Sequence, residues 1–247
     1  MCVQHWLRII RPNRFSDTRW YGRRRGRPLR KGQKFLIDHL LPNYRVKLPI
    51  IHKAQIDLNK LFGKIPNAIW MEIGFGFGEH IADLAIKNPR IGFIGCDPYI
   101  NGVASLLAKI KYEGIENIRI FDNDVRLLFP FLPEACIERL LILFADPWPK
   151  HRHRGRRITV DDNLSEFARI LANDGQLLFA TDQHKFAAWS LANILRERRL
   201  QWTAHQSKDW REEPEGWTPT RYYIKARNNG KNPLYIHVKR RPRNSEF

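Results

Sequence analysis

The feature that most constrains the fold is a regular alternation, between residues 68 and 198, of short apolar runs with segments of helical spacing. The apolar runs predict strands, and the intervening segments predict helices because their apolar residues recur every three or four positions. Parallel strands need such crossover connections, and strands covered on both faces are continuously apolar. We therefore predict an α/β fold with a mostly parallel, doubly wound sheet.

The predicted elements alternate along the chain. Strands are expected at residues 68–73, 91–96, 117–121, 140–144 and 175–181. Helices are expected at residues 79–87, 100–111, 125–132, 161–171 and 186–198. A short helix at 35–41 is expected to end at Pro42, since proline has no backbone N–H. Trp202 and residues 234–238 predict antiparallel strands that close one edge of the sheet.

A glycine-rich loop, residues 72–79, follows the first predicted strand and opens a helix. The glycines of this loop are Gly74, Gly76 and Gly78. Glycine lets a ligand approach the backbone closely, although a tight turn without a ligand needs glycine too. The dinucleotide fingerprint requires a further glycine where this chain has Glu79. An acidic residue at a helix start also opposes a pyrophosphate. Glu79 and Glu72 therefore favour a cationic cofactor, S-adenosyl-L-methionine.

Acidic residues follow three other predicted strands, and ligands of such sheets bind at the carboxyl ends of the strands. Asp97 can accept hydrogen bonds from ribose hydroxyls, or it is a turn residue before Pro98. Asp124 can contact an adenine edge or cap the next helix. Asp182 can bind substrate or cap the helix after it. We expect these side chains to share one site.

The loop after the fourth strand is the most informative segment. Asp146 emerges directly from a buried strand and can hydrogen-bond the edge of a purine, and Trp148 can stack on a base. Lys150 begins a basic run, residues 150–157, so charge that can hold phosphate follows at once. An unrelated solvated loop is the alternative interpretation.

The net charge of +18 is concentrated in three short segments. Residues 1–34 contain eleven Lys or Arg and one acid, residues 150–157 contain five and none, and residues 239–247 contain four and one. The rest of the chain has 23 basic and 23 acidic residues. Such clustering is typical of a protein that binds a polyanion, because each phosphate contact releases counterions. A solubility tail would account only for the C-terminal run.

We predict a basic flexible N-terminal arm at residues 1–34 and one domain at residues 35–247. No apolar run reaches the roughly 18 residues of a membrane span, so we expect no membrane association. Three cysteines without metal-ligand spacing predict neither a metal site nor a disulfide framework, as in a cytoplasmic protein. A mitochondrial transit peptide is the alternative for the Arg-rich start. We expect a monomer, with a homodimer as the alternative.

These segments together resemble the bacterial tRNA (guanine-N(7)-)-methyltransferase family. The similarity runs from about residue 20 through nearly the whole chain, and its specific part is the Asp-Pro-Trp turn followed by a His/Arg run. The matching pieces are residues 72–79, Asp97, Asn123, Asp124, 146–150, 153–157, Thr181, Asp182 and Thr220, with 22–26 and 31–33 upstream.

The resemblance implies a Rossmann-like class I S-adenosylmethionine-dependent methyltransferase that modifies N7 of a variable-loop guanine in tRNA. It implies cofactor contacts at Glu72, Asp97, Asp124 and Asp146, besides the three loop glycines, with Asp146 as the catalytic residue. It implies substrate contacts at Lys150, Asp182, Thr220, Arg221, Tyr222 and Tyr223.

One residue departs from the family pattern. Tyr223 occupies the position where the family usually has the glutamate of Thr-x-x-Glu, and tyrosine cannot supply that negative charge. Either Glu213 or Glu215 substitutes for it, or catalysis is weakened. A non-catalytic or weakly active RNA-binding module is therefore the alternative function. A small-molecule methyltransferase is a third hypothesis, which the clustered charge opposes.

Overall fold

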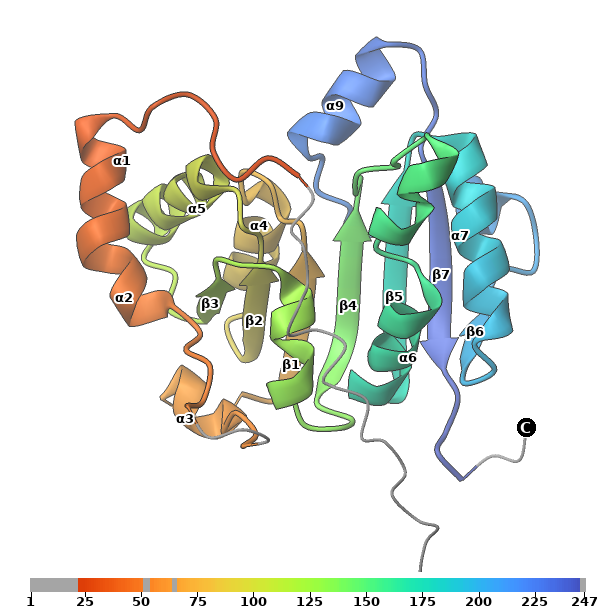
Figure 1. Ribbon diagram of the computed structural model, residues 1–247, viewed down its shortest axis with the longest axis horizontal. Helices are drawn as coiled ribbons and strands as arrows, with labels where there is room; N and C mark the ends of the chain where they lie inside the picture. Colours follow the sequence, from red (N-terminus) through yellow and green to blue (C-terminus); the bar gives the residue numbers. More distant parts are fainter. Residues whose placement is uncertain (1–21, 51–53, 64–65, 245–247) are drawn as a thin grey trace, which may run out of the picture.

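The fold is built on one seven-stranded sheet (Figure 1). The computed structural model describes residues 22–50, 54–63 and 66–244. The strands are β1 (Ala68–Ile73), β2 (Ile91–Cys96), β3 (Ile118–Phe121), β4 (Ile137–Leu143), β5 (Leu171–Thr181), β6 (Leu200–Trp202) and β7 (Leu234–Arg240). Their order across the sheet is β3-β2-β1-β4-β5-β7-β6.

Strands β1 to β5 are parallel to one another, β7 is antiparallel to β5, and β6 is antiparallel to β7. This arrangement confirms the predicted mostly parallel sheet with an antiparallel C-terminal edge. The chain places β2 and β3 on one side of β1, and β4 and β5 on the other. The winding therefore reverses between β1 and β4, where such folds bind their ligands.

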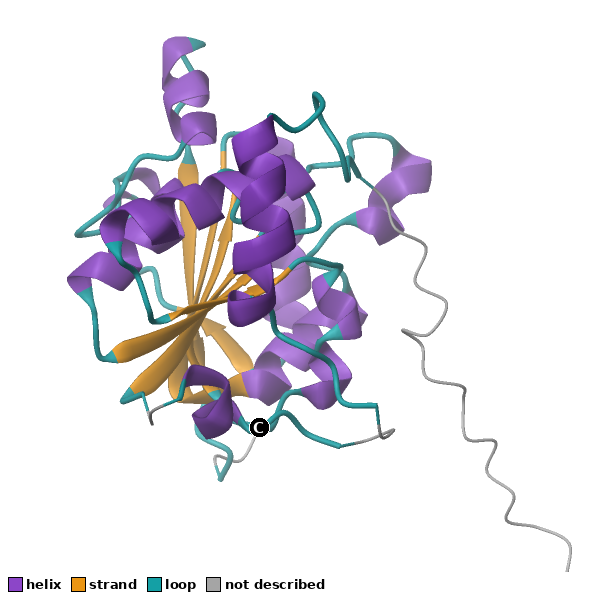
Figure 2. Ribbon diagram, turned by 90° about the vertical axis from the view of Figure 1, so that its left-hand side faces the viewer, coloured by secondary structure: helices purple, strands orange, loops and turns teal. Residues whose placement is uncertain are grey.

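Helices cover both faces of the sheet (Figure 2). Helices α2 (Leu41–Tyr44), α4 (Glu79–Lys87) and α5 (Ile100–Glu113) pack on one face, and α1 (Lys31–Phe35) lies against α5. Helices α3 (Leu58–Phe62), α6 (Asp161–Ile170) and α7 (His184–Arg196) pack on the other. The alternation within β1 explains the two cores: Ile69, Met71 and Ile73 enter one, and Trp70 enters the other.

Two helix predictions are wrong, both at prolines. The helix predicted to end at Pro42 continues to Tyr44, through a π-helical turn at Leu36–Leu40 in which the Leu41 N–H donates to the Leu36 carbonyl. That wider turn accommodates a residue without an N–H. The helix predicted at 125–132 is two 3₁₀ turns, Val125–Leu127 and Phe129–Phe131, since Pro130 cannot continue an α-helical ladder.

The C-terminal region contains two helices that the sequence pattern did not predict, α8 (Lys208–Arg211) and α9 (Arg221–Asn228). Helix α9 lies above the carboxyl ends of β4 and β5 (Figure 1). Of the predicted N-terminal arm, residues 1–21 lie outside the described residues, and the remainder includes α1, which packs against α5. In the described part of the chain, no helix is long and apolar enough to cross a membrane.

Candidate functional site

A cleft of about 530 Å³ opens at the point between β1 and β4 where the winding reverses. One wall is the segment after β1 and the opposite wall is the segment after β4, and residues 97–99, between β2 and α5, close a third side. Six of the predicted site residues line it: Gly74, Gly76, Asp97, Asp124, Asp146 and Tyr222. The structure thus brings together the acidic residues that the sequence placed at the ends of three different strands.

The glycine loop and Asp97 form a single hydrogen-bonded unit. Gly76 has a φ of 59°, in the left-handed region that favours glycine, and its N–H donates to Oδ2 of Asp97 at 2.8 Å. The other carboxylate oxygen, Oδ1, accepts from the Tyr99 N–H at 2.8 Å. Burial raises the pKa of Asp97 to about 6, although both backbone donors oppose that rise. Asp97 is therefore a rigid carboxylate with lone pairs still directed at the cleft.

Asp124 and Glu72 are both committed to partners inside the protein. Asp124 accepts from the Arg126 backbone N–H at 3.0 Å and pairs with the Arg126 guanidinium, so it caps the 3₁₀ turn while lining the cleft. Glu72 is 2% exposed and lies 3.0 Å from Nδ1 of His80. It supports the glycine loop from behind and is not part of the cleft lining, and Gly78 lies at the start of α4 behind the cleft as well.

Asp146 differs from the other acidic residues of the cleft. Its side chain is solvent accessible, and no described residue makes a hydrogen bond or an ion pair with it. Partial desolvation in the cleft nevertheless raises its pKa. A carboxylate without a partner at the edge of a cleft is available for hydrogen-bond donors of a ligand.

The turn that carries Asp146 is strained and held from several sides. Phe144 and Trp148 have φ values of 55° and 42°, which side chains rarely adopt. The Phe144 N–H donates to the Ala180 carbonyl at 2.8 Å. Arg157, only 8% exposed, donates to the carbonyls of Pro147 at 2.8 Å and Trp148 at 3.1 Å. Backbone strain of this kind persists where the surroundings over-determine it, typically at functional sites.

Helix α9 brings Tyr222 to the mouth of the cleft. Thr220 caps the helix by accepting from the Tyr223 N–H at 3.1 Å. Arg221 lies over the Phe77 ring at 4.3 Å, and its Nε lies 2.7 Å from Oε1 of Glu79, so it ties α9 to the glycine loop. The Tyr223 hydroxyl donates to the Glu213 carboxylate, outside the cleft lining.

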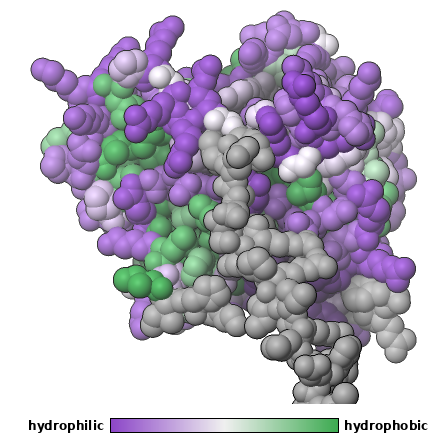
Figure 3. Space-filling model, viewed as in Figure 1, coloured by the Kyte–Doolittle hydropathy of each residue, from purple (hydrophilic) through white to green (hydrophobic). Residues whose placement is uncertain are grey.

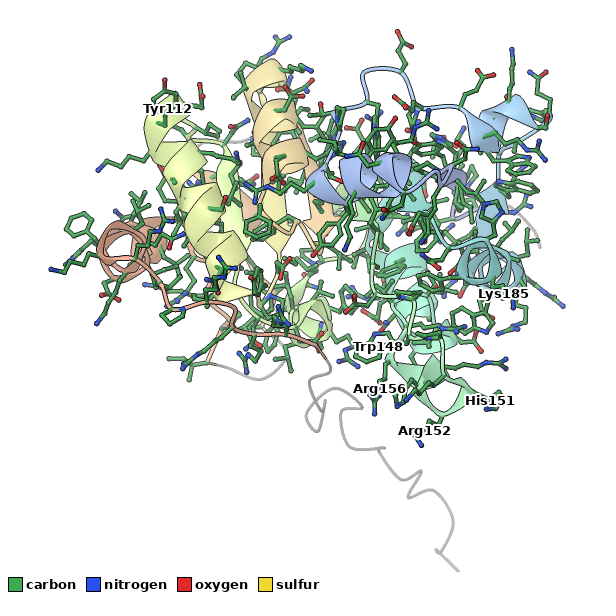
Figure 4. All side chains as sticks on the ribbon, turned by 90° about the horizontal axis from the view of Figure 1, so that it is seen from above. Tyr112, Trp148, His151, Arg152, Arg156 and Lys185 are labelled. Carbon is green, nitrogen blue, oxygen red and sulfur yellow. The ribbon has the colours of Figure 1, made fainter. Side chains whose placement is uncertain are left out.

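The basic loop divides into exposed and buried cations. Lys150, Arg152 and Arg154 are exposed, whereas Arg157 is buried against Trp189 at 4.4 Å. Arg156 lies over the Trp148 ring at 5.1 Å. Figure 4 shows Trp148, His151, Arg152 and Arg156 together on one side of the molecule, and hydrophilic side chains dominate the face in Figure 3. These cations lie directly beside the cleft.

Asp182 lies outside the cleft lining. Its Oδ2 accepts from Lys231 Nζ at 2.7 Å and from Gln183 Nε2 at 2.9 Å. Despite a contribution from burial, these partners hold the pKa of Asp182 below its usual value. Asp182 is therefore an ionised, paired carboxylate at the end of β5.

Sequence reasoning missed several residues of the cleft. Gly22 and Arg23 line it, although their segment was predicted to belong to a flexible arm. Tyr99, Arg126 and Arg156 line it too. The one available signal was position, because Tyr99 and Arg126 each lie two residues after a predicted cofactor residue.

Helix α5 packs so closely on the glycine loop that Gly102 tolerates no side chain. A Cβ added at Gly102 would lie 2.0 Å from the Gly76 carbonyl oxygen, which is backbone and cannot turn away. We expect Gly102→Ala to lower the free energy of unfolding by about 1–3 kcal/mol in urea titrations, as overpacking does. Gly32→Ala is the matched control, because nothing lies within 4 Å of its added Cβ. Equal stability of the two variants would contradict this close packing.

Two other kinds of site can be compared with the cleft. Among the described residues, no group of three or more His, Cys, Asp and Glu could hold a metal ion. A second cavity of about 310 Å³ lies between Trp217 and the strands β4, β5 and β7. Glu215, one of the two alternatives for the family's glutamate, lines it, but none of the residues predicted to bind the cofactor or the substrate does. The cleft is therefore the candidate functional site.

Comparisons with known proteins agree with the fold. Residues 66–235 match the profile of a family described as "Putative methyltransferase". The chain is 41% identical over 229 residues to a tRNA (guanine-N(7)-)-methyltransferase of Rhodospirillum rubrum, covering 92% of this chain and 90% of that protein. It is 40% identical to the protein of the same name from a Chelativorans species, covering 91% and 96% of the two chains.

Among solved structures, the 16S rRNA methyltransferase KamB is similar with a TM-score of 0.58 and 14% sequence identity. The similarity covers 76% of this chain and 95% of that one. At this level of identity the likeness shows a common Rossmann-like fold.

Proposed function

The chain belongs to the bacterial tRNA (guanine-N(7)-)-methyltransferase family, and on that premise we propose that it transfers a methyl group from S-adenosyl-L-methionine to N7 of a variable-loop guanine in tRNA. The observation that carries the proposal is the Asp146 carboxylate, with which no described residue makes a hydrogen bond or an ion pair, in a cleft that Asp97 and Asp124 also line, with exposed cations next to it. In this proposal the cleft binds the cofactor and the target base, and the cations bind the phosphate backbone of the RNA.

The cleft fits S-adenosyl-L-methionine in size and charge. Its volume lies within the roughly 300–1,000 Å³ of small-molecule sites. Asp97 can accept from ribose hydroxyls, and the carboxylates of Asp97, Asp124 and Asp146 suit a ligand that carries a sulfonium and an ammonium group. A Cβ at Gly74 would meet nothing within 4 Å, so a ligand can lie directly against that backbone.

When bound, S-adenosyl-L-methionine supplies a methyl group on a positively charged sulfur. N7 of guanine has an in-plane lone pair and no proton, so the protein needs no general base. Its tasks are positioning and placement of charge. Asp146 can accept from the N1–H and N2–H₂ donors of guanine, which orients N7 and favours the cationic methylated base.

Three further contacts belong to the substrate side of the proposal. Tyr222 is placed to pack against the target base, because its ring lines the cleft mouth. Asp182, already paired with Lys231, would meet the RNA at the end of β5. Glu213, which accepts from Tyr223, is the candidate replacement for the family's glutamate, whereas Glu215 lines the second cavity.

Transfer of a radiolabelled methyl group to bulk unmodified tRNA tests the proposed reaction, with small-molecule acceptors in parallel. We expect label in RNA only. Label in the small molecules alone would favour a small-molecule methyltransferase. Tyr223 suggests one remaining alternative, a non-catalytic RNA-binding module. Calorimetry with S-adenosylhomocysteine tests it, because such a module would bind RNA but would not bind the cofactor product.

We also propose that the protein works in the cytoplasm as a monomer.

Lys150→Ala is expected to weaken tRNA binding and to lower the slope of log affinity against log salt by about 1, since one phosphate contact is lost. The Lys150 ammonium is exposed, and no described residue forms an ion pair with it. Lys60→Ala is the control, because Lys60 is equally exposed but lies on α3 at the opposite end of the sheet (Figure 1). Filter binding across a salt series measures both. An unchanged slope for Lys150→Ala would contradict a phosphate contact.

A further inference from the structure

A short segment before α1, residues 22–27, crosses the carboxyl end of the sheet; we call it the strap. In Figure 1 the red trace runs from the start of α1 over α5 to the ends of β1 and β4, and Figure 4 shows the same path from above, ending beside Trp148. Gly22 and Arg23, at its far end, are part of the cleft lining. The strap is therefore a wall of the cleft contributed by the most basic region of the sequence.

The first turn of α5 makes hydrogen bonds to the backbone of the strap. Oδ1 of Asn101 accepts from the Gly26 N–H at 2.7 Å, and Nδ2 of Asn101 donates to the Arg27 carbonyl at 2.8 Å. The Ile100 N–H, which has no partner within its own helix, donates to the Arg24 carbonyl at 3.0 Å. One asparagine side chain thus holds the backbone of two consecutive residues, Gly26 and Arg27, independently of the side chains that the strap carries.

The fit between the strap and this turn leaves no room for a side chain. A Cβ added at Gly26 would lie 2.4 Å from the Tyr99 hydroxyl and 3.2 Å from Oδ1 of Asn101. Such a contact requires either the strap or the Tyr99 ring to move. Removing the Tyr99 hydroxyl would relieve the closest approach, which makes Gly26 and Tyr99 a testable pair.

The turn that holds the strap also holds the carboxylate of Asp97, which is proposed to bind the cofactor. Tyr99 N–H donates to Asp97, and Asp97 in turn accepts from Gly76 of the glycine loop. At the far end, Arg23 lies close enough to the Tyr222 phenol to oppose the rise in its pKa that burial, Asp146 and Asp97 produce. The strap therefore connects the cofactor side of the cleft with α9 on the substrate side.

We propose that Asn101 is a positioning residue that clamps residues 22–27 against α5, so that the strap completes the cleft and its order is coupled to cofactor binding. This inference rests on the proposed function, since it assumes that the cleft binds S-adenosyl-L-methionine. Cofactor binding stabilises the turn from Asp97 to Asn101, and the clamp transmits that stabilisation to the strap. By reciprocity, an ordered strap strengthens cofactor binding.

Hydrogen exchange of the full-length protein, with and without S-adenosylhomocysteine, tests the coupling. In the wild-type protein we expect the ligand to slow amide exchange in residues 22–27. In Asn101→Ala we expect exchange there to be about tenfold faster, with no further slowing by the ligand, and calorimetric affinity to fall about fivefold. Asn43→Ala is the control, because Asn43 is exposed on α2 and has no hydrogen bond to a described residue.

A second pair of variants distinguishes loss of the clamp from a general loss of structure. Gly26→Ala should weaken S-adenosylhomocysteine binding about fivefold in the wild-type background and less than twofold in a Tyr99→Phe background, since the hydroxyl that meets the new Cβ is gone. Equal losses in both backgrounds would overturn the close fit.

The two proposals fail in different ways. If the wild-type protein does not bind S-adenosylhomocysteine, the proposed function fails, while exchange in Asn101→Ala without ligand still tests the clamp. If the wild-type protein binds it and Asn101→Ala matches Asn43→Ala in exchange and affinity, the clamp is overturned and the proposed function stands.

Discussion

Replacing Asp146 with asparagine is expected to slow methyl transfer at least about a hundredfold, the scale on which loss of one preorganised electrostatic group affects a reaction. The asparagine is nearly the same size, but it presents an N–H₂ group where the guanine donors need an acceptor, and it removes the charge that stabilises the cationic product. Single-turnover transfer of labelled methyl to unmodified tRNA measures the chemical step.

The Asp146→Asn variant should remain folded. The side chain is solvent accessible and, in the part of the chain that the structure describes, has no hydrogen bond or ion pair to lose. Asp38→Asn is the matched control, because Asp38 is exposed on the helical segment before α2, away from the cleft. A wild-type rate for Asp146→Asn would remove Asp146 from the mechanism, and a cooperative unfolding transition like that of the control would show that the loss is chemical.

Cofactor affinity is expected to fall as the pH drops below about 6, because burial raises the pKa of Asp97 to about 6. Protonation removes acceptor capacity that the ribose hydroxyls need. Titrations with S-adenosylhomocysteine between pH 5 and pH 8 should show roughly a tenfold loss at the acid end, one power of ten per pH unit below the pKa. Asp97→Asn should bind weakly throughout, without this pH dependence.

The pH dependence of stability separates the loss of cofactor affinity from acid unfolding. The pKa of Asp97 in the folded protein lies above the ordinary aspartate value of 3.8, so between about pH 4 and pH 6 the folded protein binds more protons than the unfolded chain at this residue. The contribution of Asp97 to stability therefore falls as the pH rises through that window, opposite to its contribution to affinity. A wild-type affinity that stays constant down to pH 5 would contradict the role of Asp97.

The sheet could be predicted from sequence because its strands are buried. The predicted bounds of β1 and β2 match the structure, since a strand covered on both faces must be continuously apolar. Helix α9 could not be predicted from that pattern. Only Ala226 is buried in it, so it lacks an apolar stripe, and it is held instead by its Thr220 cap and by Arg221 on the glycine loop.

The function of individual cations could not be predicted from composition. Arg157 belongs to the basic run, but its guanidinium donates to the carbonyls of the turn that carries Asp146. In the C-terminal run, Arg240 is 4% exposed and donates to the Ala168 carbonyl, and Arg243 donates to the carbonyls of Arg169 and Leu171. These arginines stabilise the fold, because buried carbonyls near strand ends need donors. Lys150 remains the prediction for a phosphate contact.

Apart from Tyr222 on α9, the predicted residues that line the cleft lie shortly after strands. Asp97 and Asp146 are examples. Gly22 and Arg23 come from a segment without apolar periodicity, which the Asn101 side chain and the Ile100 N–H hold beside the cleft by hydrogen bonds. Likewise, the sequence left Glu213 and Glu215 as alternatives; neither lines the cleft, and Glu213, which lies beside Tyr223, stays the proposed replacement.

The central claim is methylation of guanine N7, and the identity of the modified nucleoside tests it most directly. Unmodified tRNA is incubated with the protein and labelled S-adenosyl-L-methionine, digested to nucleosides and separated. We predict that the label elutes with 7-methylguanosine and that Asp146→Asn yields almost none. Label in any other nucleoside would contradict the proposed reaction at this cleft.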